Sequence, residues 1–315
     1  MITRLATSLV LSLLLAAHAS AEGLTARWLG VAGLSITDGE TTLLFDPVFT
    51  KPTWRHWILG EEFRSNPEKV KAGLEAAGVK SAQAVFASHC HFDHVADIGA
   101  VSGATGAVVR GGPSLKRIAL KDPQEKAKFE DIEDKKEFTV GKFKVIPFRR
   151  THAAILHKLA IKFLPGEVPE DFHFGFYQFK EGEVWAFRIE HPDGALLVDQ
   201  GSHFFESHAE FAKKTDAYFV GIANKKSLED LVDNNMKRIE APMVVPMHFD
   251  FFLYQHDQLE DLRLPGNQIG EIRERLQKAY EPAPNLFVPK RNEEIKIPKK
   301  IMPAVNPVES PAPGV

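Results

Sequence analysis

Apolar residues fall into short runs that alternate with turn residues, a pattern that predicts many short strands. Asp38-Gly39 and Gly141 are turn signals that would join neighbouring runs as hairpins. The predicted strands and hairpins are 26–31, 34–37, 42–45, 82–88, 107–110, 138–149, 184–198, 217–222 and 243–246.

Helices are predicted where the spacing of apolar residues lengthens to three or four. The clearest covers 67–77, with Asn66 as its N-cap and Gly78 as its stop. Hairpins come first in each half of the chain and helices alternate with strands afterwards, so the predicted fold is α/β with a two-sheet core and helices outside. The other predicted helices are 94–101, 114–121, 206–214, 228–240 and 269–280. A long loop is predicted at 48–64, and the charged segment 122–137 is predicted to be a solvated surface stretch.

Both ends of the chain are expected to lie outside the folded domain. Residues 1–21 combine a basic start, an apolar run at 5–17 and a small-residue end, which is typical of a secretory signal peptide cleaved after Ala21. The run is shorter than the ~20 residues that cross a membrane, so no transmembrane anchor should remain after cleavage. We therefore expect an exported protein, periplasmic or secreted, with a folded domain at 22–297 and an extended, proline-rich tail at 298–315.

Charge and cysteine content narrow the function. A net charge of −3 argues against a nucleic-acid binder, which needs many cationic side chains to contact phosphate. Cys90 is the single cysteine, so an internal disulfide cannot form. Stability must then come from a core, with bound metal as a second source.

The candidate chemistry lies in one run, His89-Cys90-His91-Phe92-Asp93-His94, at the end of the predicted strand 82–88. Residues two apart in an extended chain point the same way, so His89 and His91 can reach one cation. Asp93 and His94 leave the following turn on a neighbouring side and could hold a second cation. Three histidines and a carboxylate within six residues are hard to explain as a solvated patch, and we interpret the run as a metal site.

Further ligands should come from later strand ends, because rigid strands present functional residues where they give way to loops. His152, Asp199 and His248 each come just after a predicted buried strand. These three residues are the candidates for completing the site.

The histidine run resembles the H-x-H-x-D-H signature of the metallo-β-lactamase superfamily, and the later candidates follow in that family's order. The opening segment 28–47 is similar to the start of the ascorbate-phosphate lactonase-like and phospholipase D-like branches. The resemblance covers about residues 24–290. It implies a four-layer αβ/βα sandwich of two mixed sheets with a dinuclear metal site at one edge.

The resemblance also implies a division of the ligands between two metals. The first metal would be held by His89, His91 and His152, and the second by Asp93, His94 and His248. The bridging carboxylate should come from 197–202, where Asp199 is the only carboxylate. Another alignment places Gly201 at the ligand position, in which case one metal would bind well and the second weakly.

Residues around the site have weaker signals. Asp46 and Asp250 could orient ligands from behind, although Asp46 followed by proline is also a turn former. Cys90 should face away from two ligands that share a side, so it is interpreted as a small buried residue.

Aromatic side chains are concentrated in two segments, 48–64 and 153–181. Trp54, Trp57 and Phe174 are candidates for contacting a bulky apolar or amphiphilic substrate. The alternative, which we favour, is that the aromatic residues pack on one another or bury a contact with a second copy of the chain in a homo-oligomer.

The expected reaction is hydrolysis by a metal-bound hydroxide, because cations lower the pKa of bound water to about 7. Asp93 could orient that nucleophile or carry its proton. The substrate would be a small-molecule or amphiphilic ester, lactone, amide or phosphodiester. Two zinc ions are expected, with one ion, or iron or manganese, left open. An iron-containing oxidoreductase and a non-catalytic binding module remain as alternatives.

Overall fold

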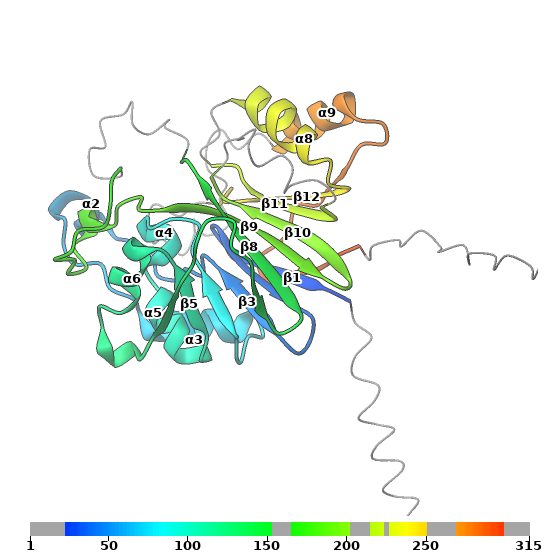
Figure 1. Cartoon of the computed structure of the whole chain (residues 1–315). Coiled ribbons are helices and arrows are strands. Elements are labelled where there is room, and N and C mark those ends of the chain that lie inside the picture. The colour runs from blue at the N-terminus through cyan, green and yellow to red at the C-terminus, as the bar shows by residue number, and fades with distance from the viewer. Residues whose placement is uncertain (1–22, 153–164, 202–214, 224–226, 251–268, 299–315) are drawn as a thin grey trace, which may run out of the picture.

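Two mixed sheets of seven strands pack face to face with helices on their outer sides. The computed structural model describes residues 23–152, 165–201, 215–223, 227–250 and 269–298. Figure 1 shows the layers, with α3, α5 and α6 against one sheet and α8 and α9 against the other. The predicted α/β fold, a four-layer αβ/βα sandwich, is confirmed.

The first sheet has the order β14-β1-β2-β3-β4-β5-β6, and the second has the order β13-β12-β11-β10-β9-β8-β7. The strands of the first sheet are β1 (Thr25–Gly30), β2 (Gly33–Thr37), β3 (Thr42–Phe45), β4 (Ala84–Phe86), β5 (Val108–Gly111), β6 (Lys128–Asp131) and β14 (Glu294–Lys296). Those of the second are β7 (Phe138–Val140), β8 (Phe143–Arg150), β9 (Val184–His191), β10 (Gly194–Asp199), β11 (Ala217–Gly221), β12 (Met243–Met247) and β13 (Asn285–Leu286).

The described helices are α2 (Trp54–Leu59), α3 (Pro67–Ala76), α4 (Phe92–Val95), α5 (Ile98–Thr105), α6 (Pro113–Ala119), α8 (Lys237–Ile239) and α9 (Ile269–Ala279), with the π-helical turn η5 (Asp230–Met236) and the 3-10 turns η1 (Pro123–Glu125) and η3 (Phe176–Gln178). The predicted helix 67–77 begins as expected, because the Asn66 side chain accepts hydrogen bonds from the backbone N–H of Glu68 and Lys69.

Aromatic rings pack against one another across the interface between the two sheets. The ring of Phe86 in β4 lies 4.9 Å from that of Phe45 and 5.1 Å from that of Phe187 in β9 of the second sheet. Every residue of β10 is buried, because this strand is covered on both faces. A core between two sheets is therefore the main source of stability.

A second apolar cluster lies between the first sheet and its helices. Phe63, Phe172, Phe176 and Phe179 from the two aromatic segments are each at most 2% exposed within it. For these residues the packing interpretation is therefore confirmed.

The strand directions decide where the site forms. Strands β3, β4 and β5 run parallel in the first sheet, as do β10, β11 and β12 in the second. Strand β8 has the same direction as β10, since both pair antiparallel with β9. The carboxyl ends of these strands meet at one edge of the sandwich, and the candidate residues follow them.

Several predictions made from the pattern were wrong in detail. The predicted loop 48–64 contains helix α2. The segment 122–137 lies at the surface as predicted, and it also forms η1 and the edge strand β6. The helix expected at 94–101 is two helices, α4 and α5, which meet at Ala96 and Asp97. The helix expected at 228–240 is largely π-helical. The predicted helix 206–214, the signal segment and the tail beyond residue 298 lie outside the described residues.

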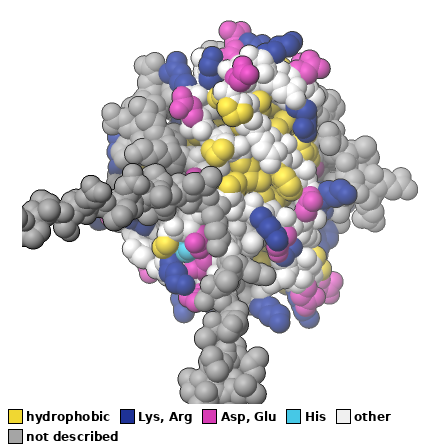
Figure 2. All heavy atoms as spheres, turned by 90° about the vertical axis from the view of Figure 1, so that its right-hand side faces the viewer, with side chains coloured by type: hydrophobic (Ala, Val, Ile, Leu, Met, Phe, Trp, Pro, Cys, Tyr) yellow, Lys and Arg dark blue, Asp and Glu magenta, His cyan; other side chains and the backbone are white. Residues whose placement is uncertain are grey.

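The face of the molecule seen in Figure 2 is mixed in charge. Positive and negative side chains are interspersed around a hydrophobic stretch on the face shown in Figure 2. Within the described residues, the helices are all too short or too polar to cross a membrane.

A buried carboxylate fixes both ends of the segment that carries α2. Asp97 accepts hydrogen bonds of 2.6–2.7 Å from the backbone N–H of Phe49 and Thr50 and from the hydroxyls of Thr50 and Ser65. Burial raises the pKa of Asp97 although these donors oppose it. The two ends of this segment, at Thr50 and Ser65, are thus held at one point.

Glu125 of η1 packs against the same corner. Its carboxylate lies against Gly99 of α5, where a Cβ would come within 1.9 Å of Oε2. Burial, helped by the charges of Asp122 and Asp97, raises the pKa of Glu125 to about 7. The folded chain therefore keeps this proton at pH values where the unfolded chain has lost it.

This difference predicts a pH-dependent effect of the substitution Glu125→Gln. The contribution of Glu125 to stability is fully present below its ordinary pKa and is lost as the pH rises to about 7. Relative to the parent protein, Glu125→Gln should therefore gain about 1–2 kcal/mol between about pH 5 and about pH 7.5, allowing for solvent screening of a half-buried group. Urea unfolding of both proteins at the two pH values measures this gain. An equal difference at both pH values would contradict the assignment.

Candidate metal centre

The histidine run is held between the two sheets by its backbone. After β4, the N–H of Ser88 donates to Asp46 Oδ1 at 2.6 Å, and the carbonyl of Ser88 accepts from Trp185 N–H of β9 at 2.7 Å. His91 keeps an extended backbone, and α4 begins at the next residue. The run therefore presents two histidines before the helix and two ligands, Asp93 and His94, within its single turn.

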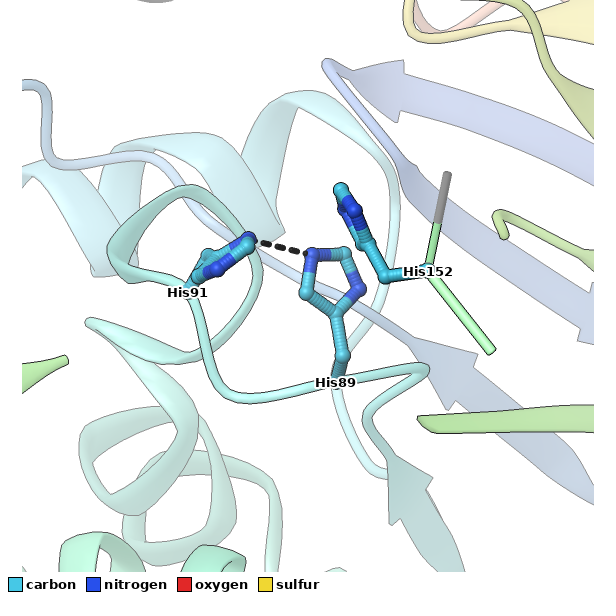
Figure 3. Close-up of side chains that lie close together, drawn as sticks. All are labelled: His89, His91 and His152. Carbon is cyan, nitrogen blue, oxygen red and sulfur yellow. Dashed lines mark hydrogen bonds between the residues drawn. The ribbon is translucent and has the colours of Figure 1, made fainter. Parts of the chain in front are cut away.

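One group of donors consists of three histidines, shown in Figure 3. His89 Nε2 lies 2.9 Å from His91 Nδ1, and the ring of His152 lies 4.7 Å from that of His89. A nitrogen of each histidine lies within 4.8 Å of a nitrogen of the others, and all three side chains are buried. His152 comes from the segment after β8, so this group joins the two sheets.

A second group consists of a carboxylate and two histidines. Asp93 Oδ2 lies 3.1 Å from His248 Nε2 and 3.8 Å from His94 Nε2. These donors are also buried and within 4.8 Å of one another. The structure thus brings together the same two sets of three residues that the family resemblance implies.

Side chains behind the histidines fix which ring nitrogen faces the site. Ser88 Oγ lies 3.0 Å from His89 Nδ1 and 3.1 Å from His94 Nδ1, and Asp46 Oδ2 lies 3.2 Å from His94 Nδ1. With the Nδ1 atoms engaged, the Nε2 atoms point to the ligand groups, an orientation typical of metal-binding histidines. Asp46 therefore lies where the sequence suggests. The contribution of Ser88 was missed, although its position directly before the run was the available signal.

His248 is positioned through its backbone. Its N–H donates to the carbonyl of Val31 at 2.8 Å, and the Val31 N–H donates to Asp250 at 3.0 Å, which also pairs with Arg291 at 3.3 Å. Asp250 therefore acts on the turn that holds His248, whereas Asp46 acts on a ring. Val31, Asp46 and His248 all have positive φ angles, of 51°, 44° and 58°. Such angles are uncommon outside glycine and mark backbone held by its surroundings.

The buried donors shift one another's protonation. Burial, reinforced by the neighbouring histidines, lowers the pKa of His89. Burial would raise the pKa of Asp93, but the field of His94 and the hydrogen bond from His248 outweigh it and lower that pKa. Burial would lower the pKa of His94, but Asp46 and Asp93 raise it. Near neutral pH, Asp93 is therefore ionised and His89 is neutral, which are the states that bind cations.

Asp199 lies at the end of β10 but belongs to neither group. Its Oδ2 forms a 2.7 Å ion pair with Arg150, and its Oδ1 accepts the Gly201 N–H at 3.0 Å. Its role as a bridge between metals stays a prediction. The sequence had given no signal for Arg150 as its partner.

The aromatic candidates divide into exposed and buried residues. Trp54 on α2 is 51% exposed, together with Ile58 and Leu59 on the same helix. Trp57 packs edge-on against Phe92 of the histidine run, with ring centroids 5.5 Å apart. Phe174 is 5% exposed and lies beneath the guanidinium of Arg64. Phe174 is therefore a packing residue, and the exposed apolar surface among these candidates is that of α2.

The donor set fits a divalent cation. Five imidazoles and one carboxylate are buried together, a combination that suits zinc, iron and similar metals. Cys90 between two of them is 1% exposed, and burial raises the pKa of its thiol. Its interpretation as a small buried residue is confirmed.

Comparison with known proteins agrees with this class of metal-binding αβ/βα sandwich. Residues 28–182 match the model of the metallo-beta-lactamase superfamily. This part of the chain belongs to the metallo-β-lactamase superfamily. A stretch of 71 residues is 38% identical to a UPF0173 metal-dependent hydrolase from Ruegeria sp. (strain TM1040), and covers 22% of this chain but only 24% of that relative.

Two solved structures share the fold. Igni18, a novel metallo hydrolase from the archaeon Ignicoccus hospitalis, superposes with a TM-score of 0.55 at 14% identity over 86% of this chain and 97% of its own. CmlA, a diiron beta-hydroxylase from Streptomyces venezuelae, superposes with a TM-score of 0.52 at 10% identity over 88% of this chain and 55% of its own. At such identities the likeness shows the fold alone.

The contact between Asp46 and His94 predicts the effect of Asp46→Asn on metal binding. Removing the negative charge behind His94 makes its Nε2 a weaker donor, so affinity for zinc should fall by about 10–100-fold. Titration against a chromophoric chelator measures this change.

Asp38→Asn is the matched control. Asp38 also pairs with a buried histidine, His191, at 3.3 Å, but it lies in the turn at the opposite end of β3. This variant should bind zinc as the parent does. Equal affinities of both variants would contradict an orienting role for Asp46.

Proposed function

We propose that this protein is a metal-dependent hydrolase that uses one or two divalent cations to activate water. The observation that carries the proposal is the pair of buried ligand groups, His89 with His91 and His152, and Asp93 with His94 and His248, at one edge of the sandwich. Similarity to relatives named as metal-dependent hydrolases supports the same reaction class.

A divalent cation held there would polarise a carbonyl or phosphoryl oxygen and make water nucleophilic near neutral pH. The protein residues supply the rest. Asp46 and Ser88 hold the rings of His89 and His94, so that little reorganisation is needed during the reaction. Asp93 stays ionised beside His248, and its carboxylate is placed to accept a proton from water or to pass one to a leaving group.

The identity of the metal separates two classes of reaction. Zinc is proposed because imidazole-rich buried sites suit it, while iron would favour an oxidoreductase of the kind suggested by the fold shared with CmlA. Colour and iron content of the purified protein distinguish the two. An ester, lactone, amide or phosphodiester is the proposed substrate, since no side-chain nucleophile is required.

The substitution His91→Ala tests the metal-dependent reaction. It removes one of three donors of the first group, so the metal content of protein purified without chelator should fall by about one ion per chain. Hydrolysis of ester, lactone or phosphodiester reporters should fall by at least about 100-fold. Elemental analysis and a reporter assay measure the two effects.

His173→Ala is the control, because His173 is exposed and outside both groups. It should change neither metal content nor rate. Parent protein that is folded, free of metal and unable to gain activity from added zinc or iron would overturn the proposal and favour a binding module.

The exposed face of α2 supports an apolar or amphiphilic substrate. Trp54 is 51%, Ile58 71% and Leu59 57% exposed, and Trp57 of the same helix contacts Phe92 between two metal ligands. The helix therefore offers an apolar surface next to the site. An acyl chain of the substrate could lie along it while its polar group reaches the metals.

Trp54→Ala should then discriminate between substrates. Loss of part of the apolar contact should raise KM for a long-chain acyl ester by about tenfold, with kcat and the KM for an acetyl ester changed by less than about twofold. Steady-state kinetics with the two esters measure this. Leu120→Ala, which removes an exposed side chain just after α6, is the control. A uniform change for both esters would show that Trp54 does not contact the acyl chain.

A further inference from the structure

The strand end that should supply a carboxylate to the metals holds a buried ion pair instead. Arg150 Nη2 and Asp199 Oδ2 are 2.7 Å apart, and each side chain is only 4% exposed. Asp199 Oδ1 accepts the N–H of Gly201. Both oxygens of the carboxylate are thus engaged by protein groups.

This ion pair lies at the edge where the ligands meet. Arg150 ends β8, two residues before His152, and reaches across β9 to Asp199 at the end of β10. Gly201 packs between Asp199 and Thr151, since a Cβ there would lie 3.3 Å from Asp199 Oδ1 and 3.4 Å from the carbonyl oxygen of Thr151. The carboxylate therefore sits beside the backbone that carries His152.

A cation and the guanidinium compete for the same carboxylate. If Asp199 turned to a metal, Arg150 would be left as an uncompensated buried charge, which is strongly unfavourable. The Nε of Arg150 is buried without a hydrogen-bond partner in the described part of the chain, so Asp199 is its principal stabilising contact. The charge of Arg150 also repels a further cation in a poorly screened interior.

We propose that Arg150 sets the metal stoichiometry of the site by holding Asp199 away from the cations. The inference rests on the proposed metal-dependent function and deepens it. With Asp199 engaged, Asp93 is the only carboxylate in the two ligand groups. The first divalent cation then binds tightly, and the second binds weakly because it would add two further positive charges opposed by a single carboxylate.

Zinc titration of the full chain against a chromophoric chelator tests the proposal. The parent protein should show two steps, with the second on the order of tenfold or more weaker than the first. Arg150→Met should tighten the second step by about tenfold and leave the first within about threefold, because Asp199 becomes available. Arg149→Met is the matched control, since Arg149 is exposed and lies over the ring of Trp185.

Two further variants test whether release of Asp199 causes the tighter second step. The double variant Arg150→Met with Asp199→Asn should lose the gain, because the released carboxylate is gone. Arg150→Gln, a neutral residue that can still donate to Asp199, should tighten the second step less than Arg150→Met does. It also replaces Arg150→Met if that variant does not fold, as judged by circular dichroism.

The outcomes separate this inference from the proposed function. Two equally tight sites in the parent protein, or loss of the second cation in Arg150→Met, would show that Arg150 does not withhold Asp199. An unchanged second step in both neutral variants would also overturn the inference. A parent protein that binds no divalent cation would instead overturn the proposed function itself.

Discussion

The face-to-face packing of the two sheets is the interaction on which the rest of the molecule depends. Phe45 and Phe86 of the first sheet pack at a tilt against Phe187 of the second, and such contacts hold the strand ends of the two sheets next to each other. Neither ligand group is complete within one sheet, since His152 and His248 come from the second. Displacement by one residue, about 3.3 Å, would far exceed the ~0.2 Å tolerance of metal coordination.

Burial at this edge makes an unpaired polar or charged group costly. At the end of the first sheet, Asp46 and Ser88 pair with the rings of the metal-site histidines. The turn around Val31 holds the backbone of His248. At the end of β10 in the second sheet, the carboxylate of Asp199 pairs instead with the guanidinium of Arg150. Both arrangements offset the cost of burying polar groups. The first keeps its partners on the metal ligands, whereas the second withholds a carboxylate, so the two cation positions differ in affinity.

Much of the site could be predicted because its signals are local. Ligand types adjoin strand ends that the apolar runs reveal, and turn residues such as Gly141 mark the hairpins. What could not be predicted depends on contacts distant in sequence. Arg150 and Asp199 lie 49 positions apart, and short edge strands such as β6, β13 and β14 exist only through their pairing. The aromatic residues of 48–64 and 153–181 suit substrate contact or a core equally well from sequence alone, and only the packing seen for residues such as Phe176 decides between them.

The division of the ligands between the sheets has a consequence for the lifetime of the protein. A cation bound by His89, His91 and His152 would link the two sheets, and it could bind only while the two sheets are packed together. Such a ligand stabilises the native state by about 2.7 kcal/mol at a hundredfold excess over its Kd. Where free metal is scarce the sheets should part more often and expose the chain to proteases. The amount of intact protein would then rise and fall with the concentration of free metal.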